Sequence, residues 1–150
     1  MPFIKPVHGP KIDLGSGAGF PGMVLAILGV PDVTLVESNT RKCVFLRQAA
    51  RLTETPVDIY EGRVEDYRPP VPAQAITARA LAPLDTLLDM AHPLLAPDGV
   101  WLFLKGRNFK QELTDSRKRW HINAEILPSE SNSSGRIVII KGLKPIHANP

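Results

Sequence analysis

The sequence predicts an α/β fold of the Rossmann-like type, with a seven-stranded, mostly parallel sheet that ends in an antiparallel hairpin. Short β-branched runs alternate with amphipathic segments of about ten to fifteen residues, as they do in doubly wound sheets. A glycine-rich turn joins the first strand to the first helix. Two extended segments with no helix between them close the chain.

The first elements alternate in the expected way. Residues 11–14 form a short strand, which the following glycine run ends. Residues 22–28 are apolar at nearly every position, so we expect a helix packed on the sheet until Gly29 and Pro31 stop it. Residues 32–37 are β-branched and apolar and end on an acid, which indicates a buried strand.

A second helix is expected from a cap at Ser38 or Asn39 to about Leu52, because a short polar side chain at that position accepts a hydrogen bond from the first turn. Its apolar residues are expected to face the sheet, while its basic residues face water. The expected inner residues are Val44, Phe45, Ala49 and Leu52, and the expected outer ones are Arg41, Lys42, Arg47 and Arg51.

The second half of the chain continues the alternation until the closing hairpin. Proline and glycine mark breaks at residues 68–72 and at Pro97-Asp98-Gly99. The expected strands are 56–60, 73–80, 100–105, 121–127 and 136–141, and the expected helices are 84–95 and 109–119.

Length and composition indicate one globular domain, since the chain has 150 residues, of which 43% are hydrophobic and 22% charged. We expect an irregular, Pro-rich arm over residues 1–10 and the domain over 11–150. No apolar run reaches the roughly 18 residues of a membrane span. A single cysteine, Cys43, and four scattered histidines argue against disulfides and a metal site. We therefore expect a cytoplasmic protein without a metal, whose net charge of +3 permits an anionic partner. A monomer is also expected, although no residue pattern bears on the oligomeric state.

The turn after the first strand reads Asp13-Leu14-Gly15-Ser16-Gly17-Ala18-Gly19-Phe20-Pro21-Gly22. Glycines such as Gly15 and Gly17 let the backbone turn tightly and approach a ligand closely. Gly17, Gly19 and Gly22 also satisfy the G-x-G-x-x-G pattern of dinucleotide sites. A carboxylate at Asp13, however, would repel a pyrophosphate and attract a cationic sulfonium. The turn therefore favours S-adenosylmethionine over NAD, which stays an alternative.

Further candidates follow the next strands, because ligands of open parallel sheets bind beyond the carboxyl ends of the strands. Glu37 ends the second strand, twenty-two residues after Gly15, where its carboxylate can accept hydrogen bonds from ribose hydroxyls. The segment 61–66 follows the third strand and offers a weak signal for purine binding. Arg79, after the fourth strand, suits a carboxylate or a phosphate.

The turn after the fourth strand, residues 76–83, lacks the Pro-Pro-aromatic motif that enzymes methylating exocyclic amines of bases often carry. It also lacks the cysteine nucleophile that enzymes methylating a pyrimidine carbon need. No strong base is evident either. An acceptor atom with a free lone pair, such as a purine N7, fits best, because its reaction needs alignment more than proton transfer. Lys105, with Lys5, Lys11, Arg79 and Arg107, is expected to form a basic collar for backbone phosphates and to position cofactor or RNA.

These residues resemble one family closely, the bacterial small-subunit ribosomal RNA guanine-N7 methyltransferases of the glucose-inhibited division protein B type. The likeness covers about residues 11–142 and is most specific where the glycine turn continues as Phe20-Pro21-Gly22. The other similar segments are 37–42 with 45–47, 62–66, 77–80, 104–106 and 135–136.

The resemblance implies a class I methyltransferase fold, S-adenosylmethionine as cofactor, and N7 of a guanine in 16S rRNA of the small ribosomal subunit as acceptor. By the same resemblance, the cofactor contacts are expected at Gly15, Phe20, Val64, Glu65 and Arg79, and the ribose contact at Glu37. Asp13 would favour the cationic end of the cofactor.

The resemblance also implies a difference at the front of the chain. Members of the family carry helices before the first strand that help to close the site, and this chain has about ten Pro-rich residues there. We therefore expect the cofactor site to be present, but without the N-terminal helices that cover it in other members of the family. Two further alternatives stay open: a methyltransferase with a small-molecule acceptor, against which the basic collar argues, and an inactive S-adenosylmethionine-binding remnant.

Overall fold

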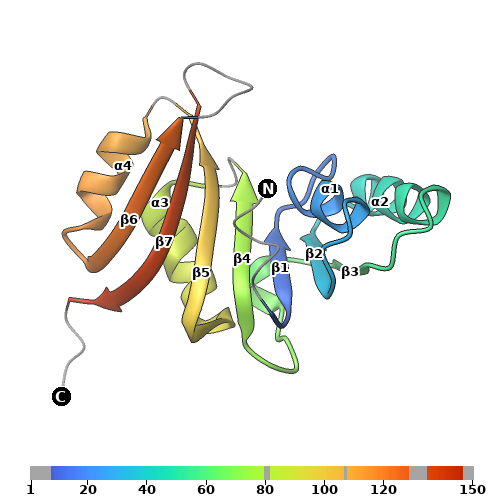
Figure 1. The fold of residues 1–150 in the computed structure, drawn as a ribbon, viewed down its shortest axis with the longest axis horizontal. Coiled ribbons are helices and arrows are strands. Elements are labelled where there is room, and N and C mark those ends of the chain that lie inside the picture. The colour runs from blue at the N-terminus through green and yellow to red at the C-terminus, as the bar shows by residue number, and fades with distance from the viewer. Residues whose placement is uncertain (1–7, 80–81, 107, 129–134, 147–150) are drawn as a thin grey trace.

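The computed structural model describes residues 8–79, 82–106, 108–128 and 135–146. The described strands form one seven-stranded sheet in the order β3-β2-β1-β4-β5-β7-β6 (Figure 1). The first five strands pair in parallel, whereas β7 is antiparallel to both of its neighbours. The predicted sheet and its closing hairpin are therefore confirmed. The strands are β1 (Lys11–Leu14), β2 (Val33–Glu37), β3 (Asp58–Glu61), β4 (Ala73–Arg79), β5 (Leu95–Lys105), β6 (Trp120–Pro128) and β7 (Arg136–Pro145).

The strand β1 lies in the middle of the sheet and all its residues are buried. Leu14 pairs with Val36 of β2 on one side and with Ala78 of β4 on the other. The chain therefore leaves β1 toward β2, while β4 lies on the opposite side. Such a switch in strand order opens a crevice at the carboxyl ends of the two diverging strands.

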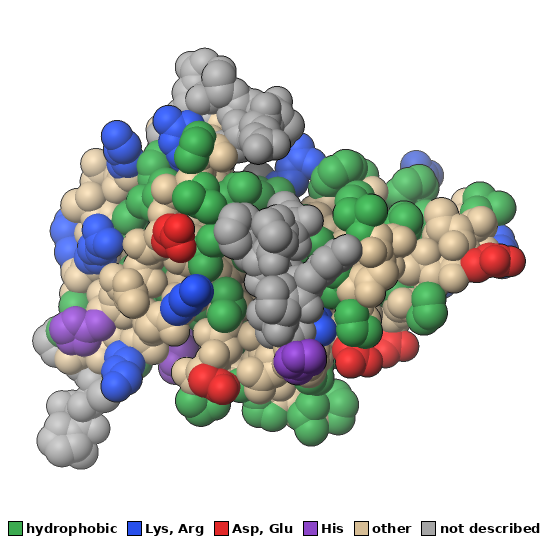
Figure 2. All heavy atoms as spheres, viewed as in Figure 1, with side chains coloured by type: hydrophobic (Ala, Val, Ile, Leu, Met, Phe, Trp, Pro, Cys, Tyr) green, Lys and Arg blue, Asp and Glu red, His purple; other side chains and the backbone are tan. Residues whose placement is uncertain are grey.

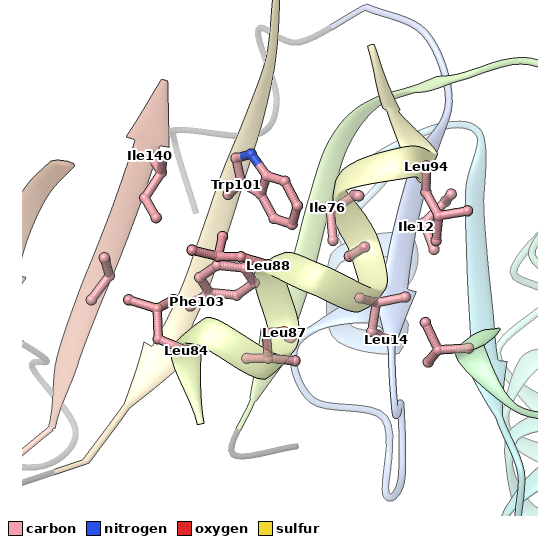
Figure 3. Packing of buried hydrophobic residues seen from close by; sticks show 14 of the residues in the cluster. Ile12, Leu14, Ile76, Leu84, Leu87, Leu88, Leu94, Trp101, Phe103 and Ile140 are labelled. Carbon is pink, nitrogen blue, oxygen red and sulfur yellow. The ribbon is translucent and has the colours of Figure 1, made fainter. Parts of the chain in front are cut away.

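Successive residues of the strands point to opposite faces, so the sheet has two apolar layers. One layer packs α1 (Gly22–Ile27) and α2 (Thr40–Leu52) at the β1–β2–β3 end. The other packs α3 (Leu84–Ala91) and α4 (Phe109–Ser116) against the middle and the hairpin end. Figure 3 shows three leucines of α3 beside aromatic residues of β5, with all of the labelled side chains belonging to this second layer: Ile12, Leu14, Ile76, Leu84, Leu87, Leu88, Leu94, Trp101, Phe103 and Ile140.

Two predicted boundaries are wrong at the start of β5. The helix α3 ends at Ala91, and a single 3-10 turn over His92–Leu94 leads directly into β5 at Leu95. The predicted turn at Pro97-Asp98-Gly99 lies within the strand. It is visible there as a jump in pairing, because Ala73 pairs with Leu95 but Ala75 pairs with Val100. The pairing of β5 with β4 is therefore irregular at the segment that contains the predicted turn.

The helix α2 begins as predicted, but its orientation differs from the prediction. The side chain of Asn39 accepts a hydrogen bond from the Lys42 N–H at 3.0 Å, which confirms this residue as the cap. The buried residues are Cys43 and Leu46. Three of the expected inner residues are exposed instead, namely Val44, Phe45 and Leu52, with exposed fractions of 47%, 50% and 82%.

The physical reason is that α2 contacts the sheet through a narrow stripe of mostly small residues, in which Cys43 and Leu46 are flanked by half-buried Ala49 and Ala50. Large apolar side chains alone do not decide which side of such a helix faces inward. In Figure 2, hydrophobic side chains accordingly gather on the surface over α1 and α2. Among the described residues, no helix is long and apolar enough to cross a membrane.

The packing of α3 leads to the first testable expectation. Leu88 is fully buried between α3 and the sheet, so Leu88→Ala should lower the free energy of unfolding by about 2–5 kcal/mol. Leu52→Ala removes the same atoms from an exposed helix end and should change stability by less than about 0.5 kcal/mol. Urea unfolding of both variants measures the difference. Equal losses would contradict the two-layer packing.

Candidate functional site

A cavity of about 540 Å³ lies at the carboxyl ends of β1, β2, β3 and β4. It brings together five of the residues that the sequence singled out: Gly15, Glu37, Val64, Glu65 and Arg79. These residues come from four separate segments, and the sheet order makes those segments neighbours. The remaining lining residues are Val36, Ser38, Asn39, Lys42, Gly62, Arg63 and Met90.

The glycine turn needs glycine because its backbone has positive φ angles at three positions. The φ angles of Gly15, Gly17 and Gly19 are 63°, 54° and 101°, a region that L side chains adopt only with strain. The N–H groups of Gly15 and Ser16 both donate to the carbonyl of Val36, at 2.8 and 3.1 Å. The turn therefore folds back on the end of β2 and leaves the Gly15 backbone at the cavity wall.

Glu37 is buried at the end of β2, and its carboxylate holds the turn in place. Oε1 accepts a hydrogen bond from the Gly17 N–H at 2.7 Å, and Oε2 accepts one from the Asn39 N–H at 2.8 Å. Each carboxylate oxygen can accept a second hydrogen bond. Glu37 can therefore bind hydroxyl groups in the cavity while it keeps both backbone contacts. Gly17 adjoins the cavity through Glu37 and is not itself part of the lining.

After β3 the chain makes one 3-10 turn over Val64–Asp66. Val64 is buried, whereas the Glu65 side chain is half exposed and lies 3.3 Å from Arg63. A hydrogen bond from its own backbone N–H, assisted by Arg63, lowers the pKa of Glu65 below its ordinary value. Val64 thus offers an apolar surface next to the Glu65 carboxylate, and this combination suits the binding of a planar ring with polar edges.

Arg79 and Phe20 meet at the rim of the cavity. Arg79 is the exposed last residue of β4, and its guanidinium carbon lies 5.9 Å from the centroid of the Phe20 ring. That distance is within the range of a cation–π contact. The Phe20 side chain is 53% exposed and is not part of the cavity lining. The structure therefore places Phe20 beside the cavity, where the resemblance predicts a cofactor contact.

Asp13 lies behind the glycine turn, although its charge was expected to act directly on a ligand. Its carboxyl is almost fully buried, and Oδ1 accepts a hydrogen bond from the Thr77 hydroxyl at 2.5 Å. A Cβ on residue 22 would collide with this side chain, so glycine is required there. Burial raises the pKa of the Asp13 carboxyl to about 6, despite opposing hydrogen bonds from Thr77 and Ser16. Asp13 thus ties β1 to β4 beneath the turn.

Among the described residues of the expected basic collar, two do not face the cavity. The Lys105 ammonium is buried, pairs with Glu112 at 2.8 Å and donates to the Ala82 carbonyl at 3.0 Å. Lys11 donates to the Pro31 carbonyl at the other end of β1. Both residues are therefore used inside the fold, because each lies next to an acceptor that only the tertiary structure brings near. Lys5 and Arg107, which were also expected in the collar, lie outside the described residues, and of the described members Arg79 alone lines the cavity.

Sequence reasoning missed two cations that do line the cavity, Lys42 and Arg63. Lys42 was expected on the water-facing side of α2. The available signal was its position in the first turn of the helix that follows Glu37, since that turn lies at the carboxyl edge of the sheet. The described residues contain no group of three or more His, Cys, Asp or Glu side chains that could hold a metal ion.

Comparison with known proteins identifies the family. The family model described as GidB, rRNA small subunit methyltransferase G, matches residues 1–140. The chain belongs to this family. Ribosomal RNA small subunit methyltransferase G of Paramagnetospirillum magneticum is 51% identical over 150 residues, which are 100% of this chain and 73% of the relative. The protein of the same name from Gluconobacter oxydans is 49% identical over 134 residues, which are 89% and 69% of the two chains.

Solved structures of low sequence identity show the same fold as this member of the rRNA small subunit methyltransferase G family. The glycopeptide N-methyltransferase MtfA, crystallised with S-adenosyl-L-homocysteine, has a TM-score of 0.74 at 15% identity over 94% of this chain and 86% of its own. An rRNA methylase from Streptococcus thermophilus has a TM-score of 0.71 at 14% identity over 95% and 93%. The predicted class I methyltransferase fold and the predicted family are both confirmed.

The buried carboxyl of Asp13 leads to a pH-dependent expectation. Because its pKa is about 6 in the folded protein and lower in the unfolded chain, folding favours the protonated form. The stabilisation is fully present below about pH 4 and is lost as the pH rises through about 6, a change of about 3 kcal/mol.

Unfolding free energies of wild type and Asp13→Asn, measured from pH 4 to pH 7, test this expectation. The wild type should lose stability relative to the variant as the pH rises. Asp98→Asn removes an exposed carboxyl of the same type and controls for the change in net charge. Parallel curves for wild type and Asp13→Asn would show that Asp13 titrates alike in the folded and unfolded chains.

Proposed function

We propose that this protein transfers a methyl group from S-adenosylmethionine to N7 of a guanine in the 16S rRNA of the small ribosomal subunit. The main support is the cavity at the carboxyl ends of β1–β4, in which the Glu37 carboxylate can accept further hydrogen bonds beside the backbone of Gly15. Membership of the rRNA small subunit methyltransferase G family supports the choice of acceptor. The two relatives compared above are both named ribosomal RNA small subunit methyltransferase G, which supports the same choice.

The cavity residues fit the cofactor. A volume of about 540 Å³ is within the range of small-molecule sites. Glu37 would bind the ribose hydroxyls, and the open backbone at Gly15 would let the cofactor approach closely, while Gly17 holds the Glu37 carboxylate in place. Val64 would cover one face of the adenine and Glu65 would accept from its amino group. Arg79 would pair with the methionine carboxylate.

When bound, S-adenosylmethionine supplies a methyl group activated by a sulfonium. Guanine N7 carries a lone pair in the plane of the ring, so the new C–N bond forms as the C–S bond breaks and no proton has to be removed. The chain therefore needs to align the base rather than to deprotonate it. This fits a cavity whose buried carboxylate, Glu37, is already engaged by backbone N–H groups.

We further propose that the protein acts as a metal-free monomer in the cytoplasm, on RNA or on assembled subunits. Transfer should then persist in the presence of a metal chelator, and sedimentation should give the mass of one chain.

A radiolabelled methyl-transfer assay tests the function. Purified protein, labelled S-adenosylmethionine and 16S rRNA or small subunits from a methylation-deficient strain should give label at one guanine. Borohydride reduction and aniline cleavage, which cut the chain at 7-methylguanosine, should map it. Label on an exocyclic amine would refute the N7 assignment. Label only on a small molecule would support that alternative, and calorimetric binding of the cofactor without transfer would support an inactive remnant.

Glu37→Ala tests the cofactor site directly. Loss of a charge-assisted hydrogen bond to ribose should weaken S-adenosylmethionine binding by about 1–3 kcal/mol in calorimetry. The matched control is Glu61→Ala, because Glu61 pairs with Glu37 in the sheet register and binds Arg47 outside the cavity. That variant should bind the cofactor as the wild type does. Equal affinities of wild type and Glu37→Ala would remove Glu37 from the site.

A further inference from the structure

The ion pair between Lys105 and Glu112 is largely buried. The Lys105 ammonium lies 2.8 Å from Glu112 Oε1, and the two side chains are 7% and 20% exposed. Removing two charges from water has a large desolvation cost, and apolar residues of similar volume often stabilise a fold equally well or better. Stability is therefore a weak reason for the presence of this pair, and its further contacts have to be considered.

Both members of the pair bind the backbone at the start of α3. Glu112 Oε1 accepts a hydrogen bond from the Leu84 N–H at 2.8 Å, and the Lys105 ammonium donates to the Ala82 carbonyl at 3.0 Å. Leu84 is the first residue of α3, and the first N–H groups of a helix have no partner within it. The N-cap residue, Pro83, supplies no side-chain hydrogen bond. The pair thus fastens the start of α3 to β5 and α4.

The fastened segment connects two residues of the cavity wall. Arg79, at the end of β4, and Met90, near the end of α3, both line the cavity. Arg79 is held by its pairing with Leu104 in the sheet, and α3 is held by the leucines that pack on β5 (Figure 3). Between these two anchors, the ion pair holds the chain at Ala82 and Leu84.

The proposed cofactor position brings the acceptor next to this segment. Glu37 would bind the ribose and Arg79 the methionine carboxylate, and the sulfonium lies between these two parts of the cofactor. The target base would therefore meet the methyl group at the β4 side of the cavity, where the chain continues through Ala82.

We propose that Lys105 and Glu112 are positioning residues for methyl transfer, because they fix the backbone at Ala82 and Leu84 next to which the target base must be aligned. This inference rests on the proposed function and assigns the two residues a role within it. The ammonium and the carboxylate are already engaged with each other, so they act through the backbone that they hold. Alignment limits this reaction, and a misplacement of about 1 Å can cost about 100-fold in rate.

Neutral substitution of both residues separates positioning from stability. Lys105→Met/Glu112→Gln removes both charges together, so no unpaired charge is left buried. The glutamine oxygen can still accept from the Leu84 N–H, whereas the hydrogen bond to the Ala82 carbonyl is lost. The variant should lower kcat with 16S rRNA by about 10- to 100-fold. The KM for the RNA, the calorimetric Kd for S-adenosylmethionine and the number of cofactor molecules bound per chain should stay as in the wild type.

Arg119→Met/Asp89→Asn is the matched control. It removes another ion pair of α3, in which Arg119 lies 2.7 Å from Asp89 and both side chains are about half exposed. This pair holds α3 near its end rather than at its start. The control should therefore leave kcat and cofactor binding unchanged.

Three results would overturn the inference: a wild-type kcat in Lys105→Met/Glu112→Gln, an equal fall of kcat in the control, or a fall of kcat no larger than the fall in cofactor molecules bound per chain. The last result would mean that the pair only stabilises the fold. A wild-type protein that binds the cofactor but methylates no RNA would instead overturn the proposed function, and the positioning role with it.

Discussion

The buried residue Glu37 connects the segments after β1, β2 and β3 that line the cavity. Its carboxylate accepts from the N–H groups of Gly17 in the glycine turn and Asn39 at the cap of α2. Its backbone carbonyl accepts from the Gly62 N–H, which follows β3, at 2.9 Å, and from the Cys43 thiol at 3.3 Å. One residue at the end of β2 therefore sets the relative positions of the loops after β1, β2 and β3. The geometry of the cavity depends on it.

A second buried carboxylate, Asp13, holds the other side of the glycine turn. Its hydrogen bond to Thr77 joins β1 to β4, whereas Glu37 joins the glycine turn to β2 and β3. The turn is thus anchored from both sides, with its backbone open to the cavity at Gly15 and its one aromatic ring, Phe20, directed outward. Both carboxylates serve as fixed hydrogen-bond acceptors, which suits a site for binding and alignment.

Local patterns predicted much of this arrangement. The strand β1 has the predicted bounds, Asn39 caps α2 as expected, and Gly15, Glu37 and Arg79 line one cavity. Val64 and Glu65, which line the same cavity, were expected from the family resemblance, since the local pattern there was weak. These features depend on residues close in the chain or on the rule that parallel strands present their carboxyl ends at one edge. The inner face of α2 was predicted wrongly, because burial there depends on the helix's place over the sheet and not on the size of its apolar side chains.

The sequence by itself determined the order of strands and helices, the glycine turn with its positive φ angles, and the acid that ends β2, because each follows from local backbone and side-chain chemistry. The tertiary structure decided which charged side chains are paired inside the fold and which remain free to contact a ligand. It places Lys105 against Glu112 and Asp13 against Thr77, and it sets Arg79 beside Phe20. The physical reason is that burial and pairing of a charged group depend on its spatial neighbours, and the packing of strands and helices selects those neighbours.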